Sequence, residues 1–379
     1  MAKKAYIGVD GVARKVKKGY LGVDGVARKV RKAYIGIGGV ARPCWSGGEL
    51  TYYGKIDRIQ KSAWGLSATP VGDYALFGGG STSYTSDVPT GNVTAYTSSL
   101  VRSYPTSFGV SRFKLAAASV GDYAVFGGGA KSSSGTAAGY SNVDTYSKDL
   151  VKGTRTLEYA SHSLAASNVG DYALFAGGKD GSSGVRGTTA ISKSLVVSLP
   201  ASLTYNRVSH NAVSVGNYSI FAGGASSSSV DVYDTSLTHT VVGNYVSNIR
   251  HIGAATAGDY ALFSGGVSTN GATYYASVYA YDSSLVSSLA PSLGTARAYP
   301  ASTSLQDMAL FMGGSGASDT IFADVDAYDS SLTVQTYTSG GMGVKTLGAA
   351  TSIGNYALCG GGCASWNGAS SYVYAYTIA

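Results

Sequence analysis

The chain has 379 residues, of which 44% are apolar and 13% charged, and its mean hydropathy is close to neutral at +0.07. This composition supplies enough apolar side chains for a large core and excludes a disordered chain. No apolar run reaches the length of a membrane span or of a signal-peptide core, so we expect no membrane insertion. The 53 Gly and 30 Tyr favour turns and pleated sheet, and apolar residues do not recur at helical spacing. The composition predicts an all-β fold.

The positive charge is concentrated at the N-terminus. Residues 1–43 hold 11 of the 28 Lys and Arg residues but only two of the 21 acids, Asp10 and Asp24. The remainder has 17 basic and 19 acidic residues and is therefore nearly neutral. The net charge of +7 thus gives no basic field around the globular part, and we do not expect nucleic acid as a partner.

A 14-residue motif repeats three times in this basic segment. It begins at Tyr6 as Tyr-Ile-Gly-Val-Asp-Gly-Val-Ala-Arg-Lys-Val and recurs, with small changes, from Tyr20 and Tyr34. Asp-Gly and Gly-Gly pairs at its centre are typical of two-residue hairpin turns. They predict three consecutive hairpins within residues 1–48, and in the first hairpin they place Val9 opposite Val12, Ile7 opposite Arg14 and Tyr6 opposite Lys15.

A second, longer repeat fills the rest of the chain, residues 49–379. A phrase of the form Gly-Asp-Tyr-Ala-Leu-Phe-x-Gly-Gly occurs in seven copies, spaced by 42 to 49 residues. The copies begin at Gly72, Gly121, Gly170, Gly216, Gly258, Gln306 and Gly354. Repeats of this period indicate the blades of a propeller.

Each copy predicts four antiparallel strands, A to D. Strand A is a run of small residues, and the Gly-Asp turn reverses it into strand B, which ends in a Gly pair. Strand B is apolar on both faces, which suits a sheet packed between two neighbours. Strand C carries a Tyr in six copies, and in the first six copies a Leu follows four residues after that position, before strand D.

The ring is expected to close through the N-terminal side of the repeats. The chain ends three residues after Tyr376, so the seventh copy lacks a strand D. Leu50 precedes the first phrase by 22 residues, a spacing also found from Leu332 to Gly354. We therefore expect residues 50–54 to supply the missing strand, which leaves no open sheet edge.

The long repeat resembles the kelch repeat over residues 50–379. The period, the Gly pair, the Tyr of strand C and an Arg ahead of several A strands carry the likeness, whereas the Trp that usually follows the strand C Tyr is absent. The resemblance implies a seven-bladed kelch-like β-propeller closed by an N-terminal strand. It implies no function, because kelch propellers serve many unrelated ones.

The 14-residue repeats are similar to short hairpin repeats at the start of structural proteins from phages and prophages of Gram-positive gut bacteria. This resemblance implies that residues 1–48 bind other virion or tail proteins, and that the propeller is a virion tail-fibre head for a cell-surface glycan or protein. A shaft of such hairpins would suit a homotrimer. The alternative is a cytoplasmic scaffold for protein–protein interactions.

Two sets of residues are candidates for ligand binding. The first comprises aromatic residues of the B–C loops, which vary from 5 to 13 residues in length while the A–B and C–D turns stay short. Such loops, rich in Ser, Gly, Asn and Tyr, are typical of binding surfaces. The alternative is that each ring packs against its own loop. The candidates are Tyr84, Tyr140, Tyr274, Tyr275, Phe322, Trp366 and Tyr372.

The second set comprises basic residues eight or nine positions before the repeat phrase. They are expected at similar heights near the central channel, where a partial basic ring would bind an anionic group. The equal alternative is a structural role in which they bind buried carbonyl groups between blades. The residues are Arg112, Arg207, Arg250, Arg297 and Lys345.

No catalytic residue, metal site or cofactor is expected. His162, His210 and His251 precede the repeat phrase that leads into strand B at unequal offsets of eight, six and seven, which gives no metal-ligand spacing. Cys359 replaces the strand B Phe and is interpreted as a small buried apolar residue. A local disulfide between Cys359 and Cys363 is left open.

Overall fold

The computed structural model describes residues 49–378, except 135, 226–227, 245–247, 339–340, 344 and 366–367, together with six strands between residues 6 and 46. These six strands form three hairpins, β1 (Tyr6–Val9) with β2 (Val12–Lys15), β3 (Gly19–Val23) with β4 (Val26–Val30), and β5 (Lys32–Ile37) with β6 (Val40–Ser46). In the first hairpin Val9 pairs with Val12, Ile7 with Arg14 and Tyr6 with Lys15, which confirms the predicted register.

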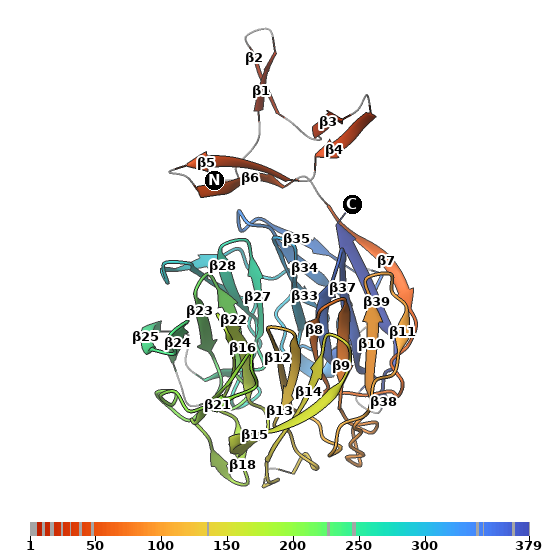
Figure 1. Ribbon diagram of the computed structural model, residues 1–379, viewed down its shortest axis with the longest axis vertical. Coiled ribbons are helices and arrows are strands. Elements are labelled where there is room, and N and C mark those ends of the chain that lie inside the picture. The colour runs from red at the N-terminus through yellow and green to blue at the C-terminus, as the bar shows by residue number, and fades with distance from the viewer. Residues whose placement is uncertain are drawn as a thin grey trace.

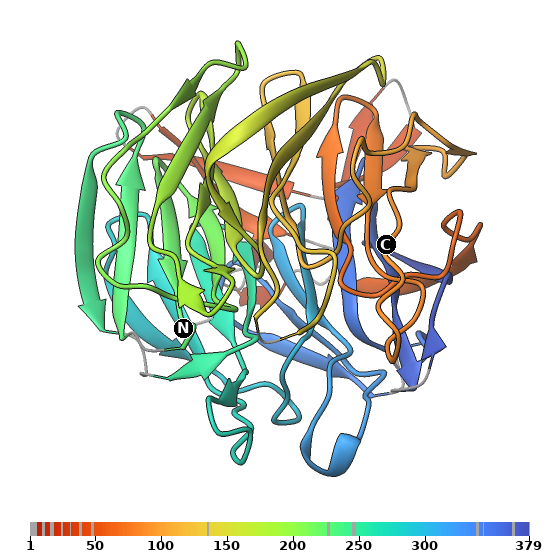
Figure 2. The same ribbon diagram turned by 90° about the horizontal axis from the view of Figure 1, so that it is seen from below.

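Seven four-stranded antiparallel sheets follow one another around a central axis, and the chain colours run once around the ring when the molecule is seen from below (Figure 2). The first three sheets, in the order A to D, are β8 (Ser67–Val71), β9 (Tyr74–Gly78), β10 (Val93–Thr97) and β11 (Arg102–Ser103); β12 (Ala116–Val120), β13 (Tyr123–Gly127), β14 (Tyr140–Ser147) and β15 (Lys152–Ser161); and β16 (Ala165–Val169), β17 (Tyr172–Ala176), β20 (Thr188–Ser192) and β21 (Val197–Ser198).

The next three sheets are β22 (Asn211–Val215), β23 (Tyr218–Ala222), β24 (Ser229–Asp234) and β25 (His239–Asn244); β27 (Gly253–Ala257), β28 (Tyr260–Ser264), β30 (Val278–Asp282) and β31 (Ser287–Ala290); and β32 (Ala301–Leu305), β33 (Met308–Met312), β34 (Val325–Tyr328) and β35 (Val334–Tyr337). Short pieces lie in the connections, namely β18 (Lys179–Asp180), β19 (Ser183–Gly184), β26 (Ile249–Arg250), β29 (Val267–Ser268), β38 (Gly368–Ala369) and a 3₁₀ turn at Ala317–Asp319.

The seventh sheet closes the ring as the spacing predicts. It consists of β36 (Thr346–Ile353), β37 (Tyr356–Ser365), β39 (Val373–Ile378) and, in the place of strand D, β7 (Leu50–Ile56). β7 pairs with β39 from Leu50 opposite Ile378 to Ile56 opposite Val373, two residues longer than expected. The chain is a seven-bladed β-propeller.

The core lies between the blades. A cluster of buried apolar side chains occupies each of the seven interfaces between neighbouring blades. The strand B Phe and the strand C Tyr meet edge to face, as in Phe126 and Tyr146, whose ring centroids are 6.1 Å apart at 86°. The Tyr146 hydroxyl donates to the Thr106 carbonyl over 2.6 Å, so this buried phenol is satisfied and holds the D–A connection against its blade.

The two ends of the propeller differ. Strands A and B, and strands C and D, are joined by tight turns at one end, which we call the turn face. The C–D turns each place a Leu in the left-handed region, with φ between 57° and 63°. The B–C and D–A connections lie at the other end, the loop face. In Figure 1 the B–C pieces β18 and β38 lie at the lower end, while the C-terminus lies at the upper end.

Candidate functional site

One residue from each blade forms a ring at the mouth of the central channel, on the loop face. Each lies seven positions before its repeat phrase and has a positive φ between 55° and 61°. Six of the backbone amides donate to the carbonyl of the counterpart in the preceding blade, over 2.8 to 3.0 Å. This circular hydrogen bonding fixes the start of every strand A. The ring consists of Gly65, Lys114, Ser163, Ser209, His251, Tyr299 and Leu347.

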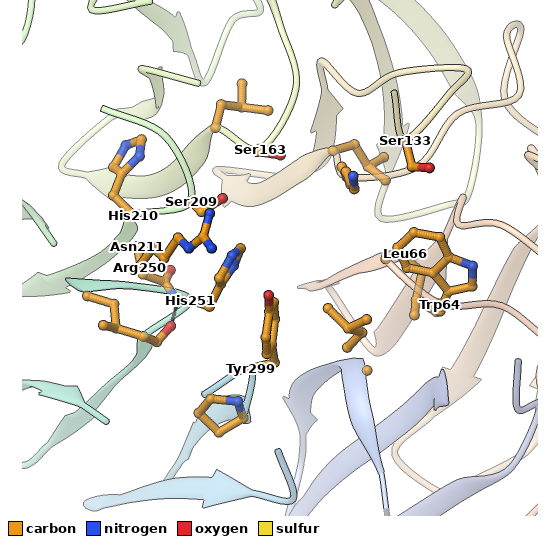
Figure 3. A pocket seen from close by; sticks show the side chains of 18 of the residues that line it. Trp64, Leu66, Ser133, Ser163, Ser209, His210, Asn211, Arg250, His251 and Tyr299 are labelled. Atoms are coloured by element: carbon orange, nitrogen blue, oxygen red, sulfur yellow. Dashed lines mark hydrogen bonds between the residues drawn. The ribbon is translucent and has the colours of Figure 1, made fainter. Parts of the chain in front are cut away.

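This channel ring opens onto a pocket of about 640 Å³ (Figure 3), a volume within the range of small-molecule sites. A second cavity of about 320 Å³ continues from it along the small residues of the A strands. Side chains of different chemistry surround the mouth, because the ring position carries a different residue in nearly every blade. No Asp or Glu lines the pocket among the described residues.

Two cationic side chains line the pocket. The Lys114 ammonium lies 5.8 Å from the centre of the Trp64 ring and 5.4 Å from that of Phe113. Burial lowers the pKa of Lys114, while the Asp87 carboxylate opposes this shift. Within the described part of the chain, neither Lys114 nor Arg250 forms an ion pair, and the buried Arg250 Nε has no hydrogen-bond partner.

Aromatic rings also line the pocket, next to these cations. His251 and Tyr299 stack with their centroids 4.0 Å apart and their planes at 24°. Burial, reinforced by the charges of Arg250 and Lys114, lowers the pKa of His251 to about 3, so that its ring is neutral at pH 7. Burial also raises the pKa of Tyr299 to about 12. In Figure 3 the His251 ring lies between Arg250 and Tyr299, and Trp64 stands across the pocket.

The predicted basic residues fall into two groups, those buried within the blades and one that lines the pocket. Arg112, Arg207 and Arg297 are fully buried, and each pairs with a strand C carboxylate of its own blade and with strand B carbonyls. Arg112 Nη1, for example, lies 2.7 Å from Asp144 Oδ2. These three residues therefore have the structural role that the sequence offered as the alternative. A side chain without exposed surface cannot contact an external ligand. Of the predicted basic residues, Arg250 alone lines the pocket.

Lys345 is also buried. Its ammonium donates to the Gly361 carbonyl, to Ser370 Oγ over 2.8 Å and to the Tyr372 carbonyl over 3.2 Å. Burial lowers the pKa of Lys345 to about 8. It therefore contributes to the packing of blade 7 rather than to a basic ring at the channel, and the expected ring does not form.

The predicted aromatic residues differ in whether they lie at the pocket. Tyr84 lines the pocket and packs on Trp64, with ring centroids 4.9 Å apart. Tyr274 lies close enough for its phenol to raise the pKa of Tyr299, after the larger effects of burial and of Arg250 and Tyr84. The other described candidates do not line the pocket: Tyr140, Tyr275 and Phe322 are half-buried, and Tyr372, 37% exposed, has Lys55 and Arg58 above its ring. Trp366 lies outside the described residues.

The cysteines and histidines form no metal centre among the described residues. Cys359 and Cys363 are buried free thiols, so the disulfide that the sequence left open is absent. Both lie on β37, four residues apart, and an extended strand separates such positions by more than a disulfide spans. In the part of the chain that the structure describes, no helix is long and apolar enough to cross a membrane.

Sequence reasoning missed the residues that shape the pocket, above all Lys114, Tyr299 and Trp64. A repeat is recognised by the positions that stay the same, whereas the channel ring is the position that changes from blade to blade. The useful signal is a variable position inside an otherwise regular repeat. The channel-ring position lies two residues after the structural Arg of the repeat, so it can be located in the sequence.

The sequence matches no protein-family model and no curated protein. Among solved structures, that of YjhT is similar, with a TM-score of 0.59 and 13% sequence identity. The superposition covers 75% of this chain and 99% of that one. That likeness shows the fold alone.

Proposed function

We propose that the protein is a non-enzymatic recognition head that binds a cell-surface carbohydrate or protein through the loop face. One observation carries this proposal: the pocket and the attachment point lie at opposite ends of the propeller. β7 begins at Leu50, which pairs with Ile378 at the turn face, so residues 1–48 join the propeller there. The pocket lies at the loop face, among the long B–C connections.

This arrangement suits a tethered binding module, because the tether leaves the loop face free. The resemblance of residues 1–48 to hairpin repeats of phage and prophage structural proteins supports a tail-fibre-like protein, attached to a virion through this basic segment. The 11 Lys and Arg residues of that segment favour an acidic docking surface on the particle.

The proposal is tested by the binding of fluorescently labelled protein to a panel of intact Gram-positive gut bacteria. We expect saturable binding to some strains, and Tyr84→Ala and Tyr299→Ala should weaken it. Tyr53→Ala is the matched control, because Tyr53 is 55% exposed on β7 and does not line the pocket. Because the proposed role is non-enzymatic, carbohydrate recovered after binding should have the same mass as before.

Two results would contradict the proposal. If Tyr53→Ala abolished binding while Tyr84→Ala and Tyr299→Ala retained it, recognition would be assigned to the outer strand of blade 7 and not to the pocket. Absence of binding to every strain, together with capture of a defined protein partner inside the cell, would favour the scaffold alternative.

A further inference from the structure

The basic residues seven to nine positions before the repeat phrase follow a pattern that two of them break. Arg112, Arg207 and Arg297 lie near the channel and pair with Asp144, Asp231 and Asp326. Lys345 at the same repeat position has carbonyl and hydroxyl partners. A partly buried cation without a partner has given up hydration without compensation. Lys114 and Arg250 are half-buried, form no ion pair within the described chain, and both line the pocket, where Lys114 has the Trp64 and Phe113 rings beside its ammonium.

The charges of Lys114 and Arg250 both act on one side chain of the pocket wall. Each of them lowers the pKa of His251. The acid that opposes the burial of Lys114 is Asp87, whose Oδ2 already accepts hydrogen bonds from the Ser133 amide over 2.7 Å and from the Ser133 hydroxyl over 2.8 Å. The pocket is therefore positive, and an anion would supply the missing counter-charge.

The remaining wall fits a hydroxyl-bearing ring that has an apolar face. Following the channel ring, Ser163 and Ser209 lie between Lys114 and His251 and offer hydroxyl groups. Tyr299 turns one face to His251, and its other face looks across the pocket toward Trp64 (Figure 3). Sugars present an apolar face to such rings and hydroxyls to such side chains.

We propose that the pocket binds a pyranose that carries a carboxylate or a phosphate, with Lys114 and Arg250 holding the anionic group and Tyr299 facing the sugar ring. This inference rests on the proposed function, because it names the ligand chemistry of the same site. It goes further in predicting that neutral sugars bind poorly.

The test is isothermal titration of the full-length protein with four probes: D-glucuronate, D-glucose 1-phosphate, D-glucose and inorganic phosphate. We expect at least one anionic sugar to bind about tenfold or more tightly than glucose and than phosphate, and added salt should weaken it. The two anionic sugars distinguish a carboxylate from a phosphate ligand.

Variants assign the effect to the pocket. Lys114→Gln and Arg250→Gln should each weaken binding about tenfold, whereas Lys114→Arg and Arg250→Lys, which keep the charge, should retain most of it. Lys148→Gln is the matched control, since Lys148 is 54% exposed on the turn face and pairs with Asp122 over 3.5 Å. Unchanged melting temperatures confirm that each variant folds.

Several results would overturn the inference. These are equal affinity for glucose and glucuronate, equal affinity for phosphate and glucose 1-phosphate, no binding of any probe, or an equal loss in Lys148→Gln. Cell binding separates this failure from that of the proposed function. If Lys114→Gln and Arg250→Gln bind cells like the unchanged protein while Tyr299→Ala does not, only the anionic ligand is wrong.

Discussion

Leu50 pairs with Ile378 across the junction of β7 and β39, so residues 328 positions apart in the chain complete one sheet. Leu50 is 3% exposed and belongs to the cluster between blades 6 and 7, whereas the neighbouring Thr51 points outward. β7 is joined covalently to the first blade and by backbone hydrogen bonds to the last, so it fastens the two ends of the ring together.

Closure should therefore stabilise the whole ring. We expect Leu50→Ala to lower the free energy of unfolding by about 2 to 5 kcal/mol, and Thr51→Ala to have little effect. Deletion of residues 46–56 should lower the melting temperature further, because it removes all of β7 and exposes the edge of β39. Thermal and chemical unfolding measure all three. A deletion variant that melts like the intact chain would contradict closure.

The buried Arg–Asp pairs should be replaceable only as pairs. Asp326→Asn should destabilise the fold by about 3 to 5 kcal/mol, because it leaves Arg297 buried without a counter-charge. Blade 5 has Ile249 and Tyr279 at the equivalent positions. We expect the double variant Arg297→Ile, Asp326→Tyr to be more stable than Arg297→Ile or Asp326→Tyr alone, as a double-mutant cycle of these variants would show. A double variant less stable than either single variant would contradict this.

Stability should fall in mild acid because three histidines are buried in the neutral form. Burial lowers the pKa of His162 to about 4 and that of His251 to about 3, and it lowers the pKa of His210 well below its ordinary value. Between these values and about 6.5, the unfolded chain binds more protons than the folded one, so stability falls as the pH falls. The slope is about 1.4 kcal/mol per pH unit for each histidine.

Unfolding in denaturant from about pH 7 to about pH 4.5 measures this slope. His251→Phe keeps an aromatic ring against Tyr299 and should reduce the slope by one histidine's share. A free energy of unfolding that stays constant over this range would show that the histidines titrate normally.

Gln306 occupies a position that favours glycine. It has a φ of 54° in the A–B turn of blade 6, where the other six copies have Gly with φ between 50° and 54°. The left-handed region costs a non-glycine residue about 1 to 2 kcal/mol, more than the flexibility that glycine adds to the unfolded chain. Gln306→Gly should therefore raise the melting temperature, while Leu305→Gly, within β32, should lower it. A lower melting temperature for Gln306→Gly would show that its side chain makes compensating contacts.

Much of the fold follows from the sequence because each repeat phrase specifies a turn and the strand after it. The count of seven follows from the seven copies of the phrase, and the closing strand follows from the spacing of Leu50 to Gly72. The role of Arg112, Arg207 and Arg297 was left open, although the deciding signal was present. An Asp stands two residues before the strand C Tyr in the same three copies, as Asp144, Asp231 and Asp326.

The site itself could not be predicted in the same way. Lys114, Ser209 and Tyr299 share a backbone position, but nothing in the repeat phrase indicates that this position faces the channel. The stack of His251 on Tyr299 joins blades 5 and 6, and the pocket depends on such contacts between blades. Spacing along the chain does not encode them.

The central claim, that the loop face is the recognition face, is tested most directly by hydroxyl-radical footprinting of the protein with and without bound cell envelopes. We predict that Tyr84 and Tyr299 lose reactivity on binding, whereas Tyr53 on β7 keeps it. Protection of Tyr53, with Tyr84 and Tyr299 as reactive as in the free protein, would contradict the account.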